Sequence, residues 1–214
     1  MIALGWCHAK HDIPDTLTMV GSGPVGVISA HLSSCPTARD RLRLLQTVFD
    51  AGIDCIPLAA DRIWPLPPAL ALSTEAASDV LDQLAQIEGS GQLTIAAQWN
   101  STTLPNPKAA SGREWLLALS ARNTAQDART KAAEQLISTL IAGIVVPKTV
   151  LMPTGDSCAL HLLLDRKALR DVLSRVMETA KSITAPDGIT VSVTGLWPPL
   201  NFVHSPRCMA EFLA

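Results

Sequence analysis

A short strand that runs into two prolines is the feature that most constrains this chain. Residues 191–194 alternate valine with serine or threonine, as in a strand with one buried face. Gly195 interrupts the pattern, and Pro198 and Pro199 have no N–H groups to donate to a neighbouring strand. The strand must therefore end there, and the stiff segment that follows still has Trp197 and Phe202 to bury.

Strand-like and helix-like patterns are interspersed along the whole chain, which predicts an α+β fold. The expected strands cover residues 2–7, 17–20, 25–30, 55–58, 93–99, 149–152, 158–164 and 189–193. The expected helices cover residues 36–51, 73–88, 112–146 and 167–183, the first capped by Ser34 and the third with a polar middle that faces water or breaks briefly.

A glycine-rich break at residues 89–91 divides the pattern into two predicted domains, 1–89 and 90–214. The first is an α+β domain. From residue 93 the order is strand, helix, strand, strand, helix, strand, which is the order of a ferredoxin-like fold. We therefore expect a modified ferredoxin-like second domain, with extra helix in its first crossover and the Trp-Pro-Pro tail at its end.

Composition excludes several classes of protein. The chain has 214 residues, 48% of them hydrophobic and 17% charged, which argues against disorder, and a net charge of −2, which argues against binding nucleic acid. Its 5 cysteines are odd in number and scattered, as in a reducing compartment. With no visible signal peptide and no apolar run long enough to cross a bilayer, we expect a cytoplasmic protein that is not in a membrane.

Residues 195–202, Gly-Leu-Trp-Pro-Pro-Leu-Asn-Phe, resemble the C-terminal signature G-P-x-P-P-Y-S-F of the gas vesicle protein F/L family. The chain keeps Gly195, Pro198, Pro199 and Phe202, and has Leu196 where the family usually has proline. Three further segments resemble family elements: residues 112–116 (G-[KR]-x-Y-L), 160–166 (L-x-[FY]-L-V-D-[KR]) and 56–58, although the R-F-G that usually follows the last is absent.

The resemblance implies a non-enzymatic gas vesicle assembly protein, an accessory or minor structural component located in the cytoplasm and at the gas vesicle. It implies as partners the small hydrophobic shell protein and other accessory proteins, with no cofactor. The signature residues Gly195, Trp197, Pro198, Pro199 and Phe202 have either a structural or a partner-binding role. We favour the structural role, with Trp197 and Phe202 well buried.

Three patterns suggest chemistry, and each lacks a requirement of its motif. Residues 21–26 match G-x-G-x-x-G, but a strand-like segment follows instead of a helix, so we interpret them as a hairpin turn. Cys7 and His8 are adjacent and point to opposite faces of a strand, which disfavours a zinc site.

A cysteine–histidine nucleophile pair would combine Cys158 or Cys55 with His161 or His31, but Cys158 and His161 are three residues apart and face opposite sides of a strand. We predict no catalytic cysteine, no metal and no nucleotide. The alternative hypotheses are a small-ligand-binding protein or Cys/His-dependent enzyme on a ferredoxin-like fold, and a regulatory dimer that acts through sheet edges.

Overall fold

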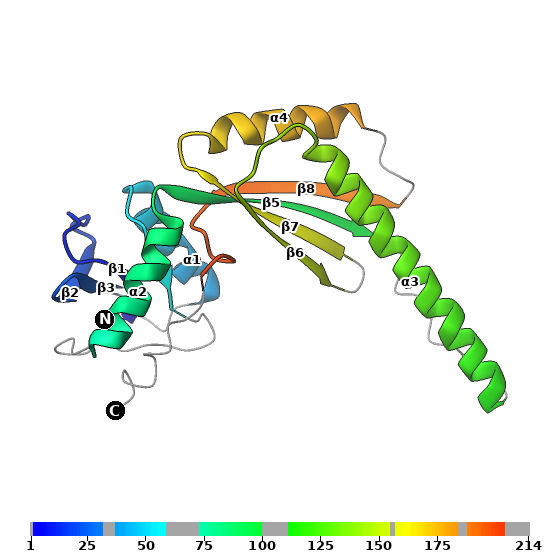
Figure 1. Cartoon of the computed structure of the whole chain (residues 1–214), viewed down its shortest axis with the longest axis horizontal. Coiled ribbons are helices and arrows are strands. Elements are labelled where there is room, and N and C mark those ends of the chain that lie inside the picture. The colour runs from blue at the N-terminus through cyan, green and yellow to red at the C-terminus, as the bar shows by residue number, and fades with distance from the viewer. Residues whose placement is uncertain are drawn as a thin grey trace. The chain divides into compact units, whose positions relative to one another are not determined.

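The computed structural model describes residues 2–31, 37–58, 73–99, 111–154, 157–183 and 188–203 (Figure 1). The chain divides into two compact units, Met1–Gln92 with Trp197–Ala214, and Leu93–Leu196. In this division the residues after Leu196 group with the first unit, and the expected domains 1–89 and 90–214 stay a prediction.

The first unit contains a four-stranded sheet in the order β2-β3-β1-β4 and two helices. Its elements are β1 (Ile2–His8), β2 (Leu17–Ser22), β3 (Val25–Ala30), α1 (Ala38–Asp50), β4 (Ile56–Pro57) and α2 (Thr74–Ile87). β1 pairs antiparallel with both β3 and β4, and β2 pairs antiparallel with β3. The predicted opening strand and the predicted hairpin of residues 17–30 are confirmed.

Helix α1 begins at a different cap from the one expected. Thr37 is the N-cap, its hydroxyl accepting from the Asp40 backbone N–H at 3.2 Å, while Asp40 Oδ2 accepts from the Thr37 backbone N–H at 3.0 Å. This reciprocal pair is a capping box. The expected cap Ser34 lies outside the described residues, as does Pro36.

The second unit is built on a sheet in the order β6-β7-β5-β8. Its elements are β5 (Ser90–Trp99), α3 (Gly112–Leu140), β6 (Lys148–Thr154), β7 (Ser157–Asp165), α4 (Leu169–Ser182) and β8 (Ile189–Trp197). All four strands predicted for this sheet lie in it, in the predicted order with the helices. The finer assignment to a ferredoxin-like fold stays a prediction.

Helix α3 is continuous over 29 residues and has no break in its polar middle. It ends at Leu140, before the expected stop at Pro147, and Gly143 follows with a φ of 77°. Its buried residues all lie in the last two turns: Ala133, Leu136, Ile137 and Leu140. Figure 1 shows these turns and α4 over one face of the sheet, while the first part of α3 extends past the sheet. We call residues 112–126 of α3 the arm.

Helix α4 buries Leu169, Val172 and Val176, which are spaced by three and four residues on one face. Met177 is 42% exposed. It follows Val176 directly and is turned about 100° away from it around the helix axis, which moves it off the buried face.

Candidate functional site

The family-like signature begins with a close contact and a strained residue at the end of β8. A Cβ added to Gly195 would overlap the Leu93 side chain of β5, so glycine lets β8 lie close to that buried leucine. Leu196 has a φ of 64°, the positive value that glycine adopts readily and other residues rarely do. A proline at this position could not adopt that φ, because its ring fixes φ near −65°.

The remainder of the signature folds against the first unit. Pro198, Pro199 and Phe202 are buried, and Leu200 packs against the hydrophobic core formed by β1, β2, β3 and α1. Two short-range hydrogen bonds shape the segment, from Leu200 N–H to Pro198 O at 2.7 Å and from Phe202 N–H to Pro199 O at 3.2 Å.

The two aromatic residues of the signature differ in how deeply they are buried. Phe202 is 5% exposed, as expected. Trp197, also expected to be well buried, is only partly buried, because it is still part of β8 and precedes the residues that enter the core.

One buried polar side chain fixes the tail from outside the signature. Gln92 is 4% exposed, and its Oε1 accepts from the Asn201 backbone N–H at 3.0 Å. Gln92 and Asn201 are 109 residues apart in sequence. Sequence reasoning did not find Gln92, because a glutamine at a strand start gives no signal of a distant partner.

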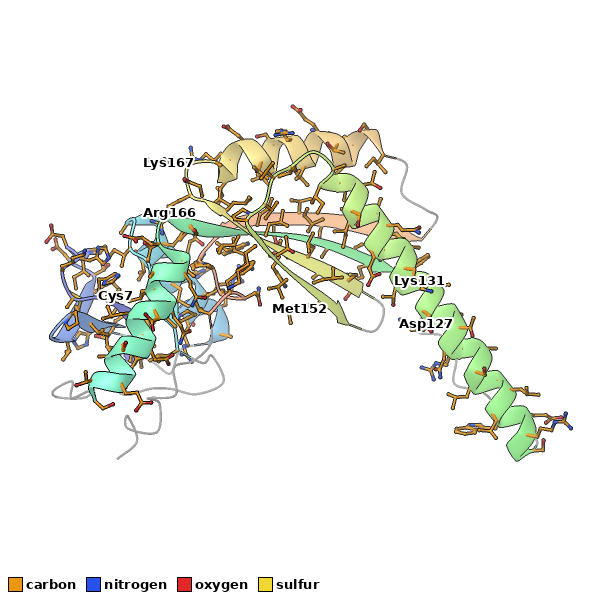
Figure 2. The ribbon with its side chains drawn as sticks, in the orientation of Figure 1. Cys7, Asp127, Lys131, Met152, Arg166 and Lys167 are labelled. Carbon is orange, nitrogen blue, oxygen red and sulfur yellow. The ribbon has the colours of Figure 1, made fainter. Side chains whose placement is uncertain are left out.

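Three exposed large apolar side chains lie at consecutive positions on the arm of α3. Trp115, Leu116 and Leu117 are 46%, 61% and 64% exposed. Ser111 caps this end, accepting from the Glu114 backbone N–H at 3.3 Å. Asp127 and Lys131, farther along α3, are labelled in Figure 2. The run of apolar residues at 115–119 has no helical period, which is the sequence signal that one packed face could not bury them all.

The candidate nucleophiles are in environments that suppress nucleophilic chemistry. Burial, followed by the Glu134 carboxylate, raises the pKa of Cys158. Burial also lowers the pKa of His161, whose Nδ1 lies 2.9 Å from Thr94 Oγ1 on β5. An activated pair needs the opposite directions, a low thiol pKa beside a histidine that can take its proton.

Cys7 and Cys55 are buried in the first unit. Burial raises the pKa of Cys7 to about 12, and Cys7 Sγ lies 3.5 Å from Met19 Sδ. Burial, then Cys7 and Asp54, raises the pKa of Cys55. Both thiols therefore stay protonated and pack as small apolar groups.

The remaining motifs do not form a site for a metal ion or nucleotide in the described part of the chain. His8 and His11 pack edge to face with ring centroids 5.9 Å apart, and among the described residues no group of three His, Cys, Asp or Glu side chains is placed to hold a metal ion. The G-x-G-x-x-G segment is the β2–β3 hairpin, in which Ser22 pairs with Val25 and Gly23 has a φ of 66°. The hairpin interpretation is confirmed.

The fold that these elements define is a two-unit α+β fold with a four-stranded sheet in each unit. It matches the crystal structure of gas vesicle protein GvpF from Anabaena with a TM-score of 0.62, over 96% of this chain and 97% of that chain, at 10% sequence identity. It matches GvpF from Microcystis aeruginosa with a TM-score of 0.64, over 94% and 97% of the two chains, at 13% identity. This chain therefore has the fold of these gas vesicle proteins.

Comparison by sequence alone gave no match. No family model and no curated protein matches the chain. Among the helices of the described residues, none is long and apolar enough to span a membrane.

Proposed function

We propose that this protein is a gas vesicle accessory protein, acting in assembly or as a minor structural component. The observation that carries the proposal is the fold, which matches two gas vesicle proteins over more than nine-tenths of this chain and of theirs. The C-terminal signature adds to it, since Gly195, Pro198, Pro199 and Phe202 occupy close-packed or buried positions at the end of β8.

The proposed role is binding and not catalysis. The raised pKa values of Cys7, Cys55 and Cys158 and the lowered pKa of His161 support this, because they disfavour a thiolate nucleophile and a basic partner for it. We also propose that the protein works in the cytoplasm and at the gas vesicle, without cofactor, nucleic acid or membrane.

The proposed partner is the small hydrophobic shell protein, and the proposed contact is the arm of α3. Trp115, Leu116 and Leu117 are all more than a third exposed on consecutive positions, so they offer an apolar surface around the helix and not along one stripe. Exposed apolar clusters of this kind are typical of sites that bind apolar partners. Other accessory proteins are a second class of proposed partner.

A gene deletion tests the proposed function in the organism that encodes the chain. We expect loss of the protein to reduce the number of gas vesicles counted by electron microscopy, and the wild-type gene to restore it. A complementing gene for Phe202→Ala should restore fewer, because that substitution opens a cavity beside the core of the first unit. An unchanged vesicle count after deletion would contradict the proposal.

A further inference from the structure

Two buried cysteines of the first unit lie opposite each other where β1 meets β4. The two strands pair antiparallel, and Trp6 of β1 is opposite Ile56 of β4. Continuing this register by one residue places Cys55 opposite Cys7, which is labelled in Figure 2. Both cysteines are buried and free.

The hydrogen bonds between the strands show what kind of pair the cysteines form. The Leu58 N–H donates to Leu4 O at 2.9 Å, and hydrogen-bonded and non-hydrogen-bonded positions alternate along an antiparallel pair. Pro57, which has no N–H, takes the next position, and the cysteines lie two positions beyond it, at a non-hydrogen-bonded pair. Opposed Cα atoms in such pairs are about 4.5 Å apart, within the range of about 4.4–6.8 Å that a disulfide spans.

Gly5 shows that the two side chains lie on the same face of the sheet. A Cβ added to Gly5 would overlap Cys55 Sγ, and Gly5 and Cys7 are alternate residues of β1, which share a face. Both cysteines also belong to one hydrophobic core cluster. The register, the face and the shared core therefore agree in making the two thiols neighbours.

We propose that Cys7 and Cys55 form an intramolecular disulfide by exchange with a low-molecular-weight disulfide such as oxidised glutathione. The thiolate of one cysteine attacks the small disulfide and releases one small thiol, and the other cysteine then attacks the mixed disulfide and releases the second. The two cysteines lose their protons and are joined by one S–S bond. The small disulfide is reduced to two thiols, which take up the two protons.

The fold makes this exchange slow in the folded chain. Burial keeps both thiols protonated, whereas the thiolate is the species that attacks a disulfide. Cys7 Sγ also lies 3.5 Å from Met19 Sδ and has to turn from this contact toward Cys55. Exchange therefore requires local opening between β1 and β4, and β4 is only two residues long.

The disulfide would change the stability of the first unit. It closes a loop from residue 7 to residue 55, which contains β2, β3 and α1. A cross-link across a long loop restricts the unfolded chain and so favours the folded one. This inference goes beyond the proposed function and does not depend on it, because the proposed contact with the shell protein uses the arm of α3.

Peptide mass mapping under non-reducing conditions tests the proposal. The full chain is refolded from urea, or incubated in the folded state, in glutathione buffers from reducing to oxidising, and its free thiols are then alkylated. In oxidising buffer we expect a cross-linked peptide that joins Cys7 to Cys55, formed more slowly in the folded sample and lost on reduction. Cys158 is the internal control, since it is also buried but lies opposite Pro153 of β6, and it should appear in no cross-linked peptide.

Circular dichroism melting of the wild-type chain and of Cys7→Ala and Cys55→Ala tests the effect on stability. The oxidised wild-type chain should melt at a higher temperature than the reduced one, and neither variant should show this shift. Equal melting temperatures for a cross-linked and a reduced wild-type chain would overturn the effect on stability. The pair itself would be overturned if the chain refolded in oxidising buffer kept both cysteines alkylated, formed only mixed disulfides with glutathione, or joined other cysteines instead.

Discussion

At the residue scale, the backbone conformation explains why this chain has Leu196 where the family signature usually has proline. The family signature usually has proline after its glycine, but residue 196 has a φ of 64°, which proline cannot adopt. Leucine pays a steric cost in this conformation that glycine does not.

A pair of truncations isolates that backbone cost. Leu196→Ala and Leu196→Gly both remove the partly buried side chain, but only alanine keeps a Cβ at positive φ. We therefore expect the glycine variant to be about 1 kcal/mol more stable than the alanine variant, the reverse of the usual order within a strand. Urea unfolding measures the difference, and an alanine variant at least as stable as the glycine variant would contradict the reading of residue 196 as strained.

The two aromatic residues of the signature differ in burial and should differ in stability effect. Phe202→Ala should lower the free energy of unfolding by about 3–5 kcal/mol, the range for a buried aromatic. Trp197→Ala should cost less, about 1–3 kcal/mol, because part of its ring is already in water. Thermal melts of both variants show which substitution lowers stability more. A larger loss of stability for Trp197→Ala than for Phe202→Ala would show that burial does not determine how much each aromatic residue contributes to stability.

At the element scale, helix α3 does two different things along its length. In its last two turns four side chains are buried, those of Ala133, Leu136, Ile137 and Leu140. In the arm the side chains of Trp115, Leu116 and Leu117 are exposed. The polar middle predicted that the helix faces water or breaks briefly there, and the helix is continuous, because a capped helix rich in alanine and leucine can extend into solvent without a buried face.

The arm can be altered without disturbing the core. We expect the double variant Leu116→Ser, Leu117→Ser to keep the wild-type melting temperature and to lose most of its binding to the shell protein, measured by biolayer interferometry. Val145→Ser is the matched control, since Val145 is also apolar and 93% exposed but lies beyond the end of α3. Equal binding by the double variant and the wild-type chain would exclude the arm as the contact.

Elements whose signals are local were predictable from the sequence. The alternation of apolar residues gave the four strands of the second unit, and residues 25–30 were recognised as a strand although they follow a G-x-G-x-x-G match. The cap of α1 was misplaced although the Thr37–Asp40 box is visible in the sequence, because Ser34 and Pro36 formed a competing start signal.

At the scale of the whole molecule, what could not be predicted depends on contacts between distant residues. Nothing local to residues 197–203 indicates that they pack with the first unit, where Leu200 meets a core built from residues 2–55 and Asn201 meets Gln92. The apolar run at residues 115–119 lacks a helical period, which indicates that one packed face cannot bury all of it, but which of these side chains are exposed depends on the packing of the whole unit.

Co-purification of the full chain with the gas vesicle shell protein from the same organism tests the proposed function most directly. We expect the tagged chain to retain the shell protein at a constant ratio through size-exclusion chromatography, and an equally tagged, unrelated soluble protein not to retain it. A correctly folded chain that never retains the shell protein would refute the proposal that this protein acts in gas vesicle assembly by binding the apolar shell subunit.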